Sequence, residues 1–151
     1  MPSILLIRHG QASFGGDDYD VLSPLGEAQA AAVADELGGR DPRPARVVSG
    51  ALVRQRDTAA PVASALDLEV GIDARWDEYD MDRILARHSD SSIRTTSHGA
   101  HGQPAISSRA FQDLLEQALG NWIEAGPAGG HDETWPQFAA RTRAALGELV
   151  G

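Results

Sequence analysis

Two short apolar segments, each followed by a helix-forming segment, constrain the fold of this chain more than any other sequence feature. Residues 3–7 form an apolar run typical of a strand that is buried on both faces. Ser23-Pro24 then provides an N-cap and a first-turn proline for a helix that is expected to end at Gly38-Gly39. Residues 46–49 and 51–66 repeat this order of strand and helix. The alternation predicts an α/β domain with a mainly parallel sheet.

The second half of the chain is predicted to be largely helical. Apolar side chains within 111–123, and again within 135–149, recur at the spacing of one helical face. A Gly/Pro loop at 126–130 separates these two helices. Residues 69–72 could add a third, shorter strand, and residues 89–105 are predicted to be a long loop. We interpret the whole chain as a single domain, because its length suits one domain.

Composition restricts the chemistry that this chain can perform. It has 13 basic and 22 acidic residues and a formal net charge of −9, so its long-range field repels nucleic acid and anionic membranes. Its apolar runs are shorter than the ~18 residues that span a bilayer, and the first seven residues lack the length and charge of a signal peptide. Cys and Lys are both absent, which excludes disulfides, thiolate metal sites and Schiff-base lysines. We expect a cytoplasmic protein whose chemistry depends on His, Arg, Asp, Glu, Ser or Thr.

The first candidate site follows the first predicted strand. Arg8-His9-Gly10 stands where the apolar run ends, and ligands of parallel α/β sheets bind beyond the carboxyl ends of the strands. A neutral imidazole can attack phosphorus, and a guanidinium offers a planar fork of donors to phosphate oxygens. Gly10 would allow a ligand close to the backbone or a positive φ. The tripeptide alone favours a structural alternative, in which His9 hydrogen-bonds a carbonyl and Arg8 lies on the surface.

Arg54 supplies a second candidate contact for an anion. It lies in the first turn of the helix predicted over 51–66, where free amides and the positive end of the helix dipole favour negative charge. Thr58 follows four residues later and shares the same helix face. The alternative is a solvated helix start, in which Arg54 pairs with an acid such as Asp57.

Four segments, in their order along the chain, resemble the histidine phosphatase superfamily, which includes the phosphoglycerate mutases. The first is the strand with its tripeptide and the Leu-Ser-Pro-Leu-Gly segment at 22–26. The second is the segment 49–59 around Arg54, and the third is 75–78, which resembles the acid-bearing segment of the family. The fourth, 133–141, resembles the opening of a late helix. The resemblance covers nearly all of the chain and implies a three-layer α/β/α fold with a mainly parallel, phosphoglycerate mutase-like sheet.

The same resemblance implies how a phosphoryl group is bound. His9 is the nucleophile that takes up the phosphoryl group, and two arginines clamp its oxygens. The residues implied to contact the phosphate are Arg8, Arg54, Gly10, Gln11 and Ser13. Because a phosphoryl group in transfer spreads negative charge over three oxygens, two guanidinium groups can supply the required charge without a metal. The neighbouring arginine charges should also keep the imidazole neutral.

The resemblance implies that Glu78 is the residue that donates a proton to the leaving oxygen. To donate a proton near neutral pH, the Glu78 carboxyl must be protonated, and burial or a nearby phosphate would favour that form. Asp77 and Asp80 flank Glu78 and could substitute for it, and a solvated acidic turn is the structural alternative. No metal or other cofactor is implied, because His98 and His101 lie in a Gly-rich loop without matching carboxylate spacing.

Departures from the family pattern narrow the expected activity. Residues 11–15 replace a Thr and an Asn that the mutases carry after the tripeptide, so a phosphatase is favoured. The second His of the family, on a late strand, has no counterpart here, because Ser97-His98-Gly99 precedes the late helices. The expected function is metal-independent hydrolysis or transfer of small phosphomonoesters through a phosphohistidine. A mutase and a non-catalytic phosphate-binding protein are the alternatives.

The end of the chain carries a further expectation. The family's sheet continues past the last helix with a central strand, between the strands that end at His9 and Ser49. This sequence stops where that strand would begin, so the domain is expected to lack its C-terminal strands. A longer chain, another strand or a partner subunit would fill the gap, and a homo-oligomer is therefore left open.

Overall fold

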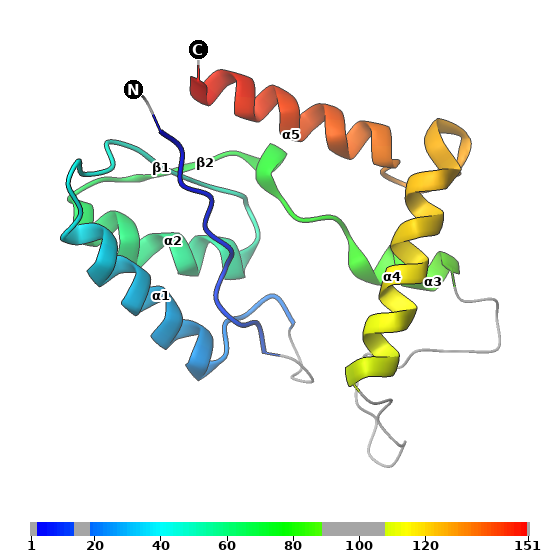
Figure 1. The fold of residues 1–151 in the computed structure, drawn as a ribbon, viewed down its shortest axis with the longest axis horizontal. Coiled ribbons are helices and arrows are strands. Elements are labelled where there is room, and N and C mark those ends of the chain that lie inside the picture. Colours follow the sequence, from blue (N-terminus) through cyan, green and yellow to red (C-terminus); the bar gives the residue numbers. More distant parts are fainter. Residues whose placement is uncertain (1–2, 14–18, 89–107, 151) are drawn as a thin grey trace. The chain divides into compact units, whose positions relative to one another are not determined.

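The structure is a computed structural model that describes residues 3–13, 19–88 and 108–150 (Figure 1). They form two compact units: unit 1 comprises Met1–Glu78 and Gly147–Gly151, and unit 2 comprises Tyr79–Leu146. Helices combine with a small parallel sheet, which confirms the predicted α/β class. The loop predicted at 89–105 lies outside the described residues.

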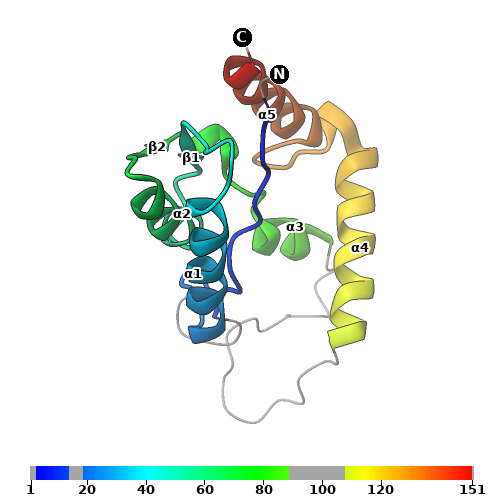
Figure 2. The same ribbon diagram turned by 60° about the vertical axis from the view of Figure 1, so that its left-hand side comes forward.

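Unit 1 is built from two helices and a two-stranded parallel sheet. The helices are α1 (Pro24–Gly38) and α2 (Val53–Leu66), and they lie side by side in Figures 1 and 2. The strands are β1 (Val47–Ser49) and β2 (Val70–Ile72), paired in register from Val47 with Val70. These four elements match the helices and strands predicted from the alternating pattern.

The core of unit 1 is aliphatic and small. Ala34 and Leu37 of α1 pack against Val62 and Leu66 of α2. The predicted start of α1 is also confirmed, because the Ser23 hydroxyl accepts a hydrogen bond from the backbone N–H of Gly26 at 3.1 Å. The helix pair therefore forms as its apolar spacing and its capping residue predict.

The prediction of a buried strand at residues 3–7 is wrong. The segment belongs to no β-sheet, and Leu6 is 81% exposed. In the described part of the chain, β1 pairs only with β2, and no strand joins β1 to residues 3–7. A strand needs partners for its backbone donors and acceptors, so an apolar run without a neighbour remains outside the sheet.

Unit 2 contains the helices of the second half of the chain. The two predicted late helices are confirmed as α4 (Ser108–Ala125) and α5 (Trp135–Val150), and α5 continues into the last residues of unit 1. A 3-10 turn, η2 (Gly126–Ala128), occupies the start of the predicted Gly/Pro loop. The short helix α3 (Met81–His88) was not predicted. None of the described helices combines the length and apolar character needed to cross a membrane.

Aromatic side chains dominate the core of unit 2. Trp122 is only 2% exposed, and its ring centroid lies 5.6–5.7 Å from those of Tyr79, Trp135 and Phe138. The Trp122 indole N–H donates to the backbone carbonyl of Glu133 at 2.8 Å. The most buried large side chain of the described residues is thus both packed and hydrogen-bonded.

Candidate active site

Side chains from three segments of unit 1 meet at one carboxylate oxygen, that of Glu78. His9 follows residues 3–7, Arg54 lies in the first turn of α2, and Glu78 follows the 3-10 turn η1 (Ala74–Trp76). Glu78 Oε2 lies 3.3 Å from His9 Nε2 and 3.0 Å from Arg54 Nη2. The structure therefore brings together the predicted nucleophile, one predicted phosphate-binding arginine and the predicted proton donor.

The hydrogen bonds of His9 define which of its ring nitrogens can react. Nδ1 lies 2.7 Å from the carbonyl oxygen of Gly10, and because a carbonyl only accepts, Nδ1 must carry a hydrogen. Nε2 is then the nitrogen whose lone pair is available in the neutral ring, and it faces Glu78. The 3.3 Å contact is a hydrogen bond when the proton resides on Nε2 or on the Glu78 carboxyl.

Arg54 is a buried cation held between two carboxylates. The residue is 7% exposed, and its Nη1 donates to Asp20 Oδ1 at 2.8 Å, on the side away from Glu78. Burial of the guanidinium opposes its charge, but the hydrogen bonds and negative charges of Glu78 and Asp20 outweigh burial and raise the pKa of Arg54. Its Nε is also buried and has no hydrogen-bond partner within the described part of the chain. Arg54 therefore stays cationic and retains one unused donor.

Asp20 is a site residue that sequence reasoning missed. The N-cap position of α2 is Leu52, whose side chain offers no acceptor. Asp20 takes over this role, since its carboxylate accepts from the N–H groups of Val53 at 2.8 Å and Arg54 at 3.3 Å. The anion at this helix terminus thus comes from the protein itself. No local signal could have identified Asp20, because it acts 34 residues away from Arg54.

Thr58 ties the backbone beside His9 to α2. Its hydroxyl accepts from the N–H of Gly10 at 2.9 Å and donates to the carbonyl of Arg54 at 2.8 Å. Gly10 itself does not have a positive φ, and a Cβ there would lie 2.4 Å from the carbonyl oxygen of Gly26. Position 10 requires glycine in this structure because the backbone of α1 approaches it closely, not because a ligand does.

The remaining predicted phosphate contacts are not joined to this cluster. Arg8 is exposed, and within the described residues its side chain forms no hydrogen bond or ion pair. The Gln11 side chain accepts from the Ser23 hydroxyl at 3.0 Å, and the N–H of Ser13 donates to the carbonyl of Val21 at 2.7 Å. Gln11 is engaged with the start of α1, whereas Arg8 is exposed to solvent.

Glu78 and its two flanking acids have different partners. Asp77 Oδ1 accepts a hydrogen bond from the N–H of Ala51 and so fixes the loop before α2. Asp80 belongs to unit 2, where it pairs with Arg83 at 3.0 Å. Of the three acids considered from the sequence, Glu78 is the one that contacts His9.

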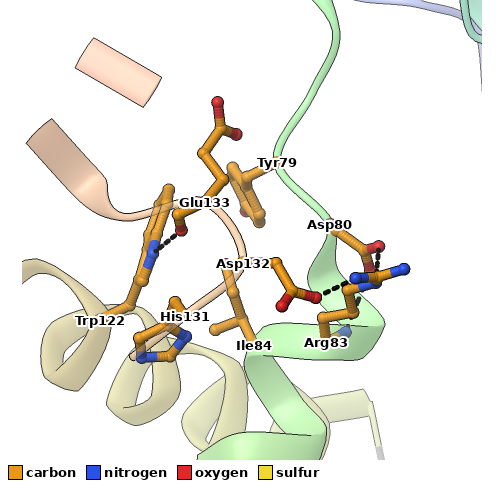
Figure 3. Close-up of a pocket in the computed structure, with 8 residues that line it drawn as sticks. All are labelled: Tyr79, Asp80, Arg83, Ile84, Trp122, His131, Asp132 and Glu133. Carbon is orange, nitrogen blue, oxygen red and sulfur yellow. Dashed lines mark hydrogen bonds and ion pairs between the residues drawn. The ribbon is translucent and has the colours of Figure 1, made fainter. Parts of the chain in front are cut away.

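A separate cavity of about 250 Å³ lies within unit 2 (Figure 3). Arg83 pairs there with Asp80 and Asp132, and hydrogen bonding to Asp132 raises the pKa of Arg83. Figure 3 shows His131 and Trp122 among the residues that line the cavity. No group of described residues has the three His, Asp or Glu side chains that a metal ion would need. His98 and His101 lie outside the described residues.

Comparison with known proteins places these features in a family. A family model of the histidine phosphatase superfamily (branch 1) matches residues 4–151. The uncharacterized protein Rv0525 of Mycobacterium tuberculosis is 50% identical over 74 residues, which cover 45% of this chain and 36% of that protein. The match therefore spans little more than a third of the length of the curated relatives.

Solved structures show the same relationship. The mycobacterial glucosyl-3-phosphoglycerate phosphatase Rv2419c in complex with VO3 is 28% identical, with a TM-score of 0.58 over 94% of this chain and 61% of that one. A protein described as mycobacterial hydrolase 2 is 27% identical, with a TM-score of 0.59 over 94% of this chain and 55% of that one. The match along almost the whole sequence and the likeness of fold agree: this chain belongs to the histidine phosphatase superfamily.

Proposed function

We propose that this chain hydrolyses or transfers the phosphoryl group of small phosphomonoesters, without a metal, through a phosphohistidine on His9. The observation that carries the proposal is the Glu78 oxygen that lies 3.3 Å from His9 Nε2 and 3.0 Å from Arg54 Nη2. A carboxyl oxygen already lies within reach of both a nucleophile and a cation. A phosphoryl oxygen that displaces it would be bound by the same groups.

In the first step, the Nε2 lone pair of His9 attacks phosphorus. The N–P bond forms as the bond between phosphorus and the leaving oxygen breaks, and the protonated carboxyl of Glu78 gives its proton to that oxygen. The ring becomes positively charged, and its Nδ1–H remains bonded to the carbonyl of Gly10, which stabilises that charge.

In the second step, water attacks the phosphohistidine. The Glu78 carboxylate accepts the water proton, the new P–O bond forms, and the N–P bond breaks with its electron pair returning to Nε2. Inorganic phosphate leaves, His9 is again neutral, and Glu78 is again protonated. An alcohol in place of water would give phosphoryl transfer by the same sequence of bonds.

Arginine charge supports both steps. The Arg54 guanidinium is fixed by Asp20 and retains an unused Nε–H donor, and Arg8 is exposed beside the nucleophile. Charge-assisted hydrogen bonds of this kind contribute about 1.5–3 kcal/mol each. The backbone N–H groups of Gly10 and Gln11 already donate to Thr58 Oγ1 and Gln29 Oε1, so either group would have to leave its acceptor to bind a phosphate.

The test compares hydrolysis of p-nitrophenyl phosphate by the parent chain and by His9→Gln, with and without EDTA. We expect activity that EDTA does not affect, complete loss in His9→Gln, and an acid-labile phosphate label on the parent alone. His88→Ala, in which a histidine of unit 2 is removed, serves as the matched control and should retain activity. Activity that survives in His9→Gln would refute the proposal. Stabilisation by vanadate without turnover or label would instead indicate a phosphate-binding protein.

A further inference from the structure

The carboxylate of Asp20 accepts hydrogen bonds from three donors at the start of α2. Its Oδ2 accepts from the backbone N–H of Val53 at 2.8 Å, and its Oδ1 accepts from the backbone N–H of Arg54 at 3.3 Å. Oδ1 also accepts from the Arg54 side chain, through Nη1, at 2.8 Å. The proposed chemistry depends on Arg54, but it does not yet explain why a carboxylate lies against a cation that is meant to bind phosphate.

These three donors are groups that bind anions when they are unoccupied. The first N–H groups of a helix have no acceptor within the helix, and the helix dipole places partial positive charge there. A phosphate bound to these N–H groups and to Nη1 would use a different nitrogen of Arg54 from the one that lies beside Glu78. Asp20 occupies this position with its own negative charge, which repels a second anion.

The remaining donors of Arg54 point toward the nucleophile. Nη2 donates to Glu78 Oε2 at 3.0 Å, and the same oxygen lies 3.3 Å from His9 Nε2. Nε–H and Nη2–H point along one edge of the planar guanidinium, and such an edge can bind two oxygens of one phosphate. Arg54 is 7% exposed, and its Nε has no hydrogen bond within the described residues. This buried donor therefore calls for an acceptor beside Nη2.

Tyr19 restrains the guanidinium from a second direction. Its ring centroid lies 5.4 Å from Arg54 Cζ, so the ring covers one face of the planar group. Asp20 holds Nη1 at the same time. Because a rotation of the guanidinium would break this charge-assisted hydrogen bond, the edge formed by Nε and Nη2 keeps its direction.

We infer that Asp20 is a positioning residue: it occupies the N–H groups of α2 and Arg54 Nη1, and so directs a substrate phosphate to the edge of Arg54 beside His9. The inference rests on the proposed function, since it concerns where the transferred phosphoryl group is bound. Asp20 then lowers the overall affinity for phosphate, because it removes donors and adds a negative charge. The phosphate that does bind is held within reach of His9 Nε2.

The test compares the parent with Asp20→Ala and Asp20→Asn by calorimetric titration of inorganic phosphate and by hydrolysis of p-nitrophenyl phosphate. Asp20→Ala frees both N–H groups and Nη1, so phosphate should bind about fivefold more tightly. Its kcat should fall at least about tenfold, because the phosphate is no longer confined to the edge beside His9. Asp20→Asn keeps an acceptor oxygen but lacks the charge, so its affinity for phosphate should rise while kcat stays within about threefold of the parent.

The NMR signal of the His9 ring reports the position of phosphate without any turnover. Saturating phosphate should shift the His9 Hε1 signal in the parent and in Asp20→Asn, and it should shift this signal clearly less in Asp20→Ala. If the parent shows the shift but neither hydrolyses the substrate nor forms a phosphohistidine, the proposed function fails while the role of Asp20 stands.

Asp57→Asn is the matched control, because it removes the same charge from the first half of α2. Asp57 is exposed, and among the described residues Arg54 pairs with Asp20 and Glu78 rather than with Asp57. At physiological salt, the field of an exposed charge is largely screened. Asp57→Asn should therefore retain the phosphate affinity, the kcat and the His9 signal of the parent.

Two results would overturn the inference. Unchanged or weaker phosphate binding by Asp20→Ala would show that the carboxylate does not exclude an anion from the start of α2. If that variant fails to fold, Asp20→Asn decides the same point, since its affinity for phosphate must exceed that of Asp57→Asn. A parental kcat or an undiminished His9 shift in Asp20→Ala would show that Arg54 places the phosphate without Asp20.

Discussion

Each of the two units is stabilised internally by a different kind of interaction. Unit 2 has an aromatic core around Trp122, in which rings pack at centroid distances of 5.6–5.7 Å. Unit 1 has a small aliphatic core between α1 and α2, and buried polar residues, Arg54 and Thr58, sit beside its proposed site. Aromatic packing thus stabilises unit 2, whereas directional hydrogen bonds fix the geometry of the proposed site in unit 1.

This difference has a physical consequence for substitutions. An apolar core loses stability in proportion to the volume removed, and neighbouring side chains partly adapt. A buried polar contact instead leaves its partner unsatisfied when one member is removed. Substitutions in the two units should therefore differ in size and in which replacement side chain restores stability.

Trp122→Ala should have the largest effect on stability. It removes the buried ring that contacts three other aromatic residues, and such a truncation costs about 3–5 kcal/mol. Urea denaturation followed by circular dichroism measures the change. Ile123→Ala, a neighbour on α4 that is 46% exposed, is the control and should change stability far less. Equal losses in both variants would contradict an aromatic core centred on Trp122.

Thr58→Val should reduce the free energy of unfolding by about 1–3 kcal/mol, because the buried N–H of Gly10 loses its 2.9 Å acceptor. The shape of the side chain is nearly preserved, so the effect reports the hydroxyl. Thr58→Ser keeps the hydroxyl and should retain both stability and the position of His9. If the Val and Ser variants lose the same stability, the hydrogen bond to Gly10 is not what stabilises this segment.

Asp20→Ala should cost about 0.5–2 kcal/mol, since it removes the cap of α2 that Leu52 cannot replace. Asp20→Asn retains an acceptor for the N–H groups of Val53 and Arg54 but lacks the charge. Thermal unfolding should therefore rank Asn between Ala and the parent. A phosphate titration of the same variants tests whether freeing Arg54 changes anion affinity, and an Ala variant as stable as the parent would exclude the capping role.

The smallest effect concerns acid pH and the exposed ion pairs of Arg75. Hydrogen bonding to Arg75 lowers the pKa of Glu148 from its ordinary 4.5 and that of Asp73 from 3.8, and it raises the pKa of Arg75. A carboxyl group whose pKa is lowered in the folded state stabilises the fold when the pH lies above the ordinary pKa of that group. This contribution is lost as the pH falls through the folded-state pKa. The parent and Glu148→Gln should therefore differ slightly in stability at neutral pH, and this difference should shrink as the pH falls below the ordinary carboxyl pKa of 4.5. A difference that grows on acidification would contradict this linkage.

Much of the fold was predictable because its signals are local. Ser23 and Pro24 determine where α1 begins, and the apolar spacing determines α4 and α5. The proximity of His9, Arg54 and Glu78 was predictable from their order along the chain, through the family resemblance. The bond between Arg54 and Asp20 and the bond between Gly10 and Thr58 were not predictable, because they join residues that are 34 and 48 positions apart in the sequence.

Two apolar segments, residues 3–7 and 46–49, were both predicted to be strands, but only the second forms one. Residues 3–7 are the more hydrophobic run, yet it is β1 that forms a strand, because β2 pairs with it. The order of amino acids is enough to show which segments favour extended or helical backbone and which side chains can carry chemistry. Which extended segment has a hydrogen-bonded neighbour, and which carboxylate reaches Arg54, depends on the folded arrangement, because backbone pairing and charge contact require distances that local sequence does not encode.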